Sequence, residues 1–72
     1  MAQLSSAQYD ALERAVVDRQ RIAVMRRGTE FIVIPISIGV RAGKETIEAL
    51  HPTTGERLTL VIDDLEEIEV VR

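Results

Sequence analysis

The stretch from Gly28 to Gly43, GTEFIVIPISIGVRAG, restricts the fold more than any other part of the chain. Every second residue from Ile32 to Val40 is a large branched aliphatic. The residues between them have large side chains at the start and small ones at the end: Phe31, Val33, Pro35, Ser37 and Gly39. A period of two predicts a β-strand, and proline or glycine within a strand is typical of bends and bulges. We therefore expect one long strand that turns a corner at Pro35 and Gly39 and belongs to both halves of a small barrel.

The two faces of this strand are expected to differ along its length. Before the corner both faces can be buried, one in the barrel core, where we place Phe31, and one beneath a helix. Beyond the corner only one face is buried, so the small side chains of Ser37 and Gly39 suffice.

The length of 72 residues predicts a single domain over residues 1–72 with one core. No cysteine is present, so neither a disulfide nor a cysteine-ligated zinc can stabilise it. Hydrophobic residues make up 46% of the chain and aromatic ones 3%, which leaves Ile, Val, Leu and Ala to fill the core. The longest apolar run is too short for a membrane-spanning helix, and the first ten residues do not resemble a signal peptide. We therefore expect a cytoplasmic protein.

The segment LSSAQYDALERAVVDRQR predicts an amphipathic helix over about residues 6–19. Ser5, followed three residues later by Gln8, has the pattern of a capping box. Tyr9, Leu12 and Val16 then recur at helical spacing.

Four further strands are expected after the helix, so that the barrel covers about residues 21–71. They are RIAVMRR (21–27), ETIEAL (45–50), RLTLVI (57–62) and IEVV (68–71). Gly28 and Gly43 can supply the positive φ of tight hairpins, HPTTGE is a loop, and DDLEE is a single 3₁₀ turn. One helix followed by five strands predicts a mainly β fold, an SH3-like or Sm-like five-stranded small barrel with an N-terminal α-helix.

The residues show no pattern for catalysis, and we expect that the protein is not an enzyme. His51 is the one histidine and stands beside Pro52 in the predicted loop, and Ser37 is the one serine outside the helix cap. The acids of DDLEEIE (63–69) offer oxygen ligands but lack the spacing of a calcium loop. No glycine-rich run leads into a helix with a lysine, as a phosphate loop requires. We expect no metal and no cofactor.

Charge is distributed unevenly along the chain. Residues 1–29 hold five arginines and three acids, a net charge of +2, whereas residues 30–72 hold four basic and nine acidic residues, a net charge of −5. Such asymmetry is found both at electrostatic interfaces and on ordinary solvated surfaces. The candidate interaction residues are four arginines and four acids: Arg19, Arg21, Arg26, Arg27, Asp63, Asp64, Glu66 and Glu67.

RNA or single-stranded DNA is an alternative ligand for the Arg19/Arg21/Arg26/Arg27 patch, because phosphates bind clustered arginines. Single strands are usually also held by stacking on aromatic side chains, and Tyr9 and Phe31 are the only two aromatics here. The net charge of −3 repels a polyanion over most of the surface. A third alternative is a stable domain whose activity resides in a neighbouring protein.

Residues 11–35 (ALERAVVDRQRIAVMRRGTEFIVIP) and 43–71 (GKETIEALHPTTGERLTLVIDDLEEIEVV) resemble a WYL domain, a likeness of pattern over about residues 9–71. The resemblance implies an Sm-like barrel with a leading helix and a proline in the second strand. WYL domains resemble ligand or nucleic-acid sensors in bacterial transcription regulators. Their Trp-Tyr-Leu triplet would fall on Glu45, Thr46 and Ile47, and their ligand-binding arginines near Leu58 and Asp64, so no ligand site is carried over.

Residues 9–15 (YDALERA) and 60–68 (LVIDDLEEI) are also similar to Rof-like Rho-binding antiterminators, which are small acidic Sm-like proteins. This resemblance implies an acidic surface around the helix that occupies the RNA-binding site of a partner. Asp10 and Glu13 match that surface in kind, whereas Arg14, Arg19 and Arg21 dilute its acidity.

We therefore expect a non-enzymatic, Sm-like barrel that acts as a protein-interaction or regulatory module in a bacterial cytoplasm, with transcription regulation as one such role. Its partner is another protein or a second copy of itself, with nucleic acid as the alternative and no membrane. Open strand edges and the isoleucine-rich second strand favour a homo-oligomer. In it, the basic helix end of one subunit would meet acidic residues 63–69 of the next.

Overall fold

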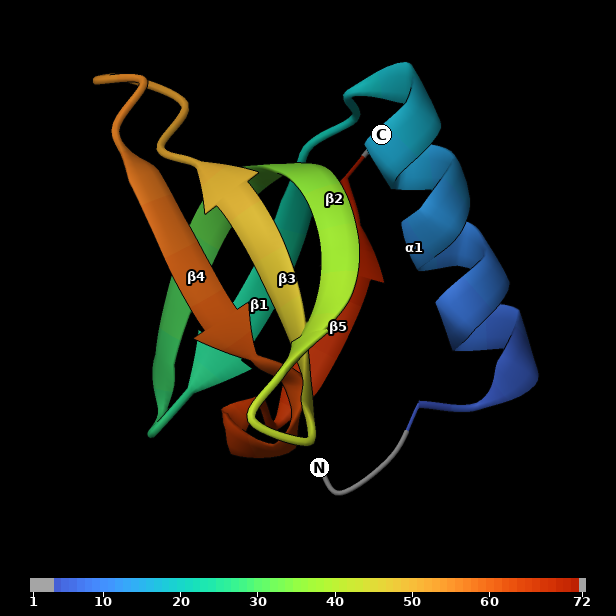
Figure 1. Cartoon of the computed structure of the whole chain (residues 1–72). Helices are drawn as coiled ribbons and strands as arrows, with labels where there is room; N and C mark the ends of the chain where they lie inside the picture. The colour runs from blue at the N-terminus through green and yellow to red at the C-terminus, as the bar shows by residue number, and fades with distance from the viewer. Residues whose placement is uncertain (1–3, 72) are drawn as a thin grey trace.

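In the computed structural model, which describes residues 4–71, one α-helix precedes five strands and a short 3₁₀ turn (Figure 1). The elements are α1 (Ser6–Asp18), β1 (Ile22–Arg26), β2 (Thr29–Arg41), β3 (Lys44–Leu50), β4 (Arg57–Val61), η1 (Ile62–Asp64) and β5 (Glu67–Val70). The strands form one antiparallel sheet in the order β4-β3-β2-β1-β5. The predicted mainly β fold with an N-terminal helix is confirmed. No helix in residues 4–71 is long and apolar enough to cross a membrane.

Side chains and backbone close both ends of α1. The predicted capping box is present: the Ser5 amide donates to Gln8 Oε1 at 2.9 Å, and the Gln8 amide donates to Ser5 Oγ at 3.2 Å. Arg19 then adopts a left-handed conformation with φ 54°, and the Gln20 amide donates to the Ala15 carbonyl at 2.9 Å. This bonding satisfies carbonyls that the last turn would leave free, and it directs the chain into β1.

The long strand β2 belongs to both parts of the sheet, as predicted. Residues 29–33 pair with β1, and residues 34–41 pair with β3. The register shifts between Pro35 and Ser37, which face Ala49 and Glu48, so that Ile36 is an extra residue in β2. Such a bulge bends a strand and increases its local twist, and Figure 1 shows β2 curving over the other strands.

Gly39 has no part in this corner, and that half of the prediction was wrong. It pairs in regular register with Thr46, and a Cβ added at Gly39 would meet no atom within 4 Å. The bend is produced by the inserted Ile36 beside buried Pro35, so a glycine is not required two residues further on.

The bend folds the sheet over a single core. In Figure 1, β1, β5 and the first part of β2 lie behind β3, β4 and the second part of β2, while α1 stands against β2 and β5. The buried hydrophobic residues are Leu12, Ala15, Ile22, Val24, Val33, Ile47, Ala49, Leu60, Ile62 and Leu65. All of these are aliphatic, as the composition predicts.

The sheet has two free edges. Within residues 4–71 no ladder joins β4 to β5, so the sheet is not closed into a barrel. α1 lies along β5, whereas β4 pairs only through β3.

The two tight hairpins use left-handed backbone at both central residues. The φ angles are 53° and 76° at Arg27 and Gly28, and 51° and 76° at Ala42 and Gly43. Two positive φ values in succession define the primed turn whose twist matches antiparallel strands, and glycine adopts such a φ at little cost.

Candidate functional site

The structure divides the four candidate arginines between the two ends of β1. Arg19 ends α1 and Arg21 lies just before β1, whereas Arg26 ends β1 and Arg27 begins the following turn. Because an antiparallel strand rises by about 3.4 Å per residue, roughly 17 Å of extended chain separates Arg21 from Arg26, the nearest members of the two pairs. The predicted patch is therefore two separate pairs of arginines.

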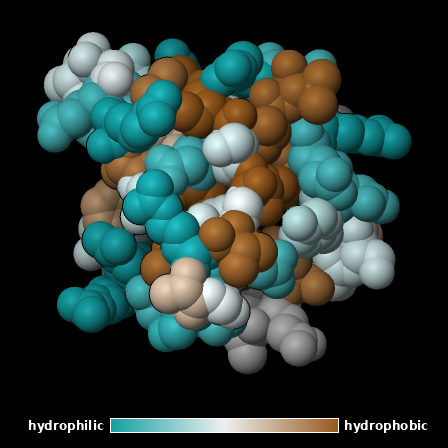
Figure 2. Space-filling view, viewed as in Figure 1, coloured by the Kyte–Doolittle hydropathy of each residue, from teal (hydrophilic) through white to brown (hydrophobic). Residues whose placement is uncertain are grey.

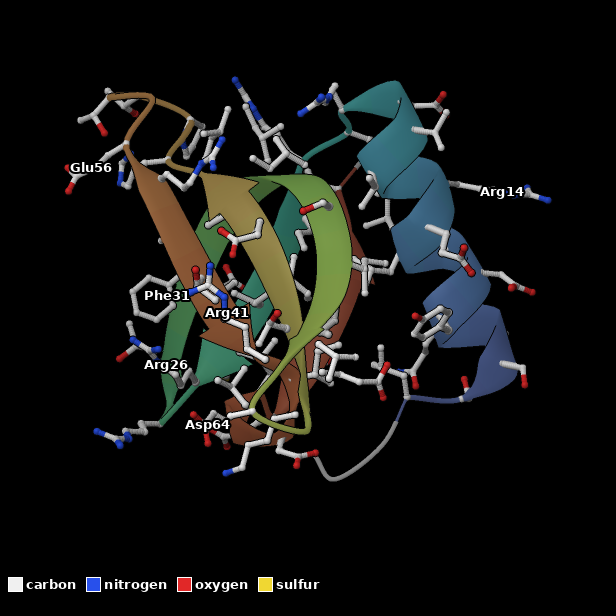
Figure 3. All side chains as sticks on the ribbon, viewed as in Figure 1. Arg14, Arg26, Phe31, Arg41, Glu56 and Asp64 are labelled. Atoms are coloured by element: carbon white, nitrogen blue, oxygen red, sulfur yellow. The ribbon has the colours of Figure 1, made fainter. Side chains whose placement is uncertain are left out.

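The pair at the end of β1 lies beside the acidic segment of the same chain. Glu66 Oε1 accepts a hydrogen bond of 2.8 Å from the Gly28 amide, and the Glu66 amide donates to the Met25 carbonyl at 2.7 Å. These two hydrogen bonds hold Glu66 against the hairpin between β1 and β2. Figure 3 shows Asp64 at the same end of the molecule as Arg26, whereas Arg14 points away from the sheet on α1. Acidic and basic candidates therefore lie at the same end of one chain.

Phe31 does not lie in the core, where it was predicted. Its side chain is 38% exposed, and the Arg26 guanidinium carbon lies 5.5 Å from the centre of its ring. Phe31 pairs with Val24, two residue pairs from the hairpin end of the ladder, and Figure 3 shows its ring at the edge of the molecule. This arginine–aromatic contact stabilises an exposed ring by about 0.5–1 kcal/mol.

The outer face of β2, β1 and β5 is the first candidate surface for interaction. Strand pairing places Glu30, Met25 and Glu67 in one row across the sheet. The next row is Ile32, Ala23 and Glu69.

The predicted burial of this face beneath the helix was wrong. Ile32 is 37% exposed, and none of Ala23, Met25 and Ile32 packs against the core. The reason is that α1 contacts β2 and β5 from the side of Leu12 and Ala15, which are buried in the core, and leaves this face open.

Other exposed hydrophobic side chains lie away from this outer face. Val40 is 68% exposed near the end of β2, and Val17 is 79% exposed on α1. Figure 2 shows hydrophobic residues gathered over β2 and along its boundary with α1, with hydrophilic residues on both sides.

A shallow groove between α1 and β5 is the second candidate surface, and the sequence did not predict it. It has a volume of about 700 Å³. Its lining residues are Ala7, Asp10, Ala11, Arg14, Asp18, Gln20 and Val70. The signal that could have revealed it is the pair Ala7 and Ala11, since small residues four apart lower one face of a helix.

The remaining polar candidates do not converge. His51 follows β3, where its Nδ1 accepts a hydrogen bond of 3.4 Å from the Thr53 amide. Ser37 faces Glu48, whose carboxylate accepts hydrogen bonds of 3.1 Å from Thr59 Oγ1 and lies 3.5 Å from an Arg41 nitrogen. Across the described part of the chain, no three His, Cys, Asp or Glu side chains are grouped to hold a metal ion.

No family model, no curated protein and no solved structure matches this chain.

Proposed function

We propose that the protein is a non-enzymatic interaction module that acts through the outer face of β2, β1 and β5. The observation on which this proposal depends is the exposure of Ile32, at 37%, on the β2 side of that face. Ala23 and Met25 lie beside it in β1 and are only half-buried. A contiguous apolar strip bordered by carboxylates is typical of a surface that a protein partner covers.

The finer fold that we propose is an SH3-like or Sm-like small barrel, left open between β4 and β5. It is supported by one bent strand shared between two ladders and by the strand order β4-β3-β2-β1-β5. Membership of the WYL or Rof-like families, and a regulatory role in transcription, stay predictions that depend on this fold.

Affinity capture tests the interaction function. The full chain serves as bait in a lysate of the source organism, complexes are chemically crosslinked before washing so that weak ones are retained, and bound proteins are identified and quantified by mass spectrometry. We expect a stoichiometric partner, or the endogenous copy of the chain itself, that is lost with Ile32→Asp and retained with Val17→Asp. Val17 is the matched control because it is more exposed than Ile32 and lies on α1. A bait that retains neither partner nor its own copy contradicts the proposal.

Binding of RNA or single-stranded DNA has weaker support as the alternative function. Its arginines are divided between the two ends of β1, and Glu66 lies against the hairpin that holds Arg27. Its test is a titration of single-stranded oligonucleotides at low salt. Binding that weakens with rising salt and with Arg26→Ala would support it, and a flat titration would contradict it.

A further inference from the structure

We infer that the outer face of β2, β1 and β5 binds a second copy of this chain, forming a symmetric dimer with the strands of the two copies antiparallel. The inference rests on the proposed interaction function and identifies the partner. Three features of the face support this inference: its apolar centre, the separation of opposite charges along it and the small side chain of Ala23 on its middle strand.

The centre of the face is apolar and narrow. Ala23 lies between Ile32 on β2 and Glu69 on β5, with Met25 one row along the same strand. Side chains alternate between faces along a strand, so Ile34 continues the strip beyond Ile32. Because Ala23 ends at its Cβ, a second sheet can approach closely over β1 at this position.

Opposite charges occupy the two ends of the face, and Glu69 lies in the central row at its β5 edge. Glu30 and Glu67 flank Met25 from the two neighbouring strands, about 5 Å to each side. Arg21 lies just before β1, and the Val71 amide, just after β5, donates to the Arg21 carbonyl at 2.9 Å. The pairing of the two strands thus continues to Arg21, and alternation places its side chain on the same face as Ala23. Arg21, Glu30 and Glu67 are all exposed.

This pattern is self-complementary. A two-fold axis that lies in the face, perpendicular to the strands and through Ala23, places Ala23 over the partner's Ala23 and Ile32 over the partner's Ile32. Each Arg21 then lies over the partner's Met25, between the partner's Glu30 and the partner's Glu67. Such an interface is isologous and closes at two subunits. Glu69 meets the partner's Glu69 at the rim, where both carboxylates remain in water.

The dimer is expected to be weak. The chain measures 28 × 23 × 22 Å, so one face offers on the order of 500 Å² per partner, below the size of most stable complexes. We therefore expect dimers to form only at high protein concentration, which sedimentation equilibrium between about 10 µM and 1 mM would measure.

Charge exchange between two chains tests the arrangement. One chain has Arg21→Glu, and the other has Glu30→Lys together with Glu67→Lys. In each homodimer like charges would face each other, so we expect self-association at least about tenfold weaker than in the natural chain. An equimolar mixture would restore the dimer, because both charge contacts become attractive in the heterodimer. Arg57→Glu is the matched control, since it makes the same charge change at an exposed position on β4.

The folding of each variant is checked by circular dichroism before the mixing experiment. A natural chain that stays monomeric at the highest concentration overturns the inference, and so does a mixture that stays monomeric when the natural chain dimerises. Neither result affects capture of a different protein through Ile32, so failure of the dimer and failure of the proposed function are distinguishable.

Discussion

Replacing glycine by alanine is expected to stabilise the protein at Gly39 in β2 and to destabilise it at Gly43 in the following hairpin. Gly39 lies in regular strand with open space at the position of a Cβ. Gly43 lies in the β2–β3 turn with φ 76°. Replacing glycine by alanine removes conformational freedom from the unfolded chain, which by itself stabilises the native state by about 0.4–1 kcal/mol. Gly39→Ala should therefore stabilise the protein by about that amount.

At Gly43 the native state opposes this gain. Alanine in left-handed backbone costs about 1–2 kcal/mol, so Gly43→Ala should give a net loss of about 0.5–1 kcal/mol. The unfolded-state contribution is nearly the same in both variants and cancels in their difference. The difference between the two variants is therefore the backbone strain alone, about 1–2 kcal/mol. In a domain of this size it corresponds to a separation in melting temperature of about 4–16 °C.

Urea denaturation followed by circular dichroism measures both free energies of unfolding. The protein is kept dilute, because self-association would stabilise the native state by mass action. Equal slopes of unfolding free energy against urea would show that both variants unfold between comparable states. The reasoning is refuted if Gly39→Ala loses as much stability as Gly43→Ala, because Gly39 would then be needed for the bend in β2.

Three further substitutions test the core, the helix cap and the second hairpin. Leu12→Ala removes a side chain that is 1% exposed and should cost about 2–5 kcal/mol. This is a large part of the free energy of unfolding of so small a domain, so the melting temperature should fall sharply. Retention of most of the stability would show that α1 does not close the core. Ser5→Ala removes the acceptor of the Gln8 amide and should cost about 1 kcal/mol, with faster hydrogen exchange confined to the first turn of α1. Unchanged exchange there would contradict the cap. Ala42→Asn places an Asn-Gly pair in the β2–β3 turn, where φ is 51°, and should raise the free energy of unfolding by about 0.5–1 kcal/mol, seen as a higher urea midpoint. A lower midpoint would contradict the turn geometry.

Local patterns in this sequence predict local structure well. The Ser5–Gln8 capping box, the change of period after the helix and the glycines of the two hairpins each depend on residues within a few positions of one another. The order and approximate bounds of the helix and all five strands are confirmed for this reason. The bend in β2 was also expected, because a proline in a long apolar strand marks an irregularity.

What the sequence could not predict depends on which surfaces meet. Phe31 is as hydrophobic as its neighbours, yet it stands near the first hairpin and is 38% exposed. Arg21 and Arg26 are close in sequence, but an extended strand carries them to opposite ends of the sheet. The exposure of the apolar strip around Ile32 could be recognised only once the position of α1 was known. The helix and strands could therefore be predicted from the sequence, whereas the candidate surfaces could be identified only from the three-dimensional arrangement.

The bulge at Ile36 has a consequence for how the protein unfolds. Two of the four ladders contain β2, and this strand alone joins the β1–β5 pair to the β3–β4 pair, so loss of its register separates the two parts of the sheet. The fold therefore behaves as a single cooperative unit despite having two layers, and amides from β1 and from β4 are expected to exchange through the same global opening.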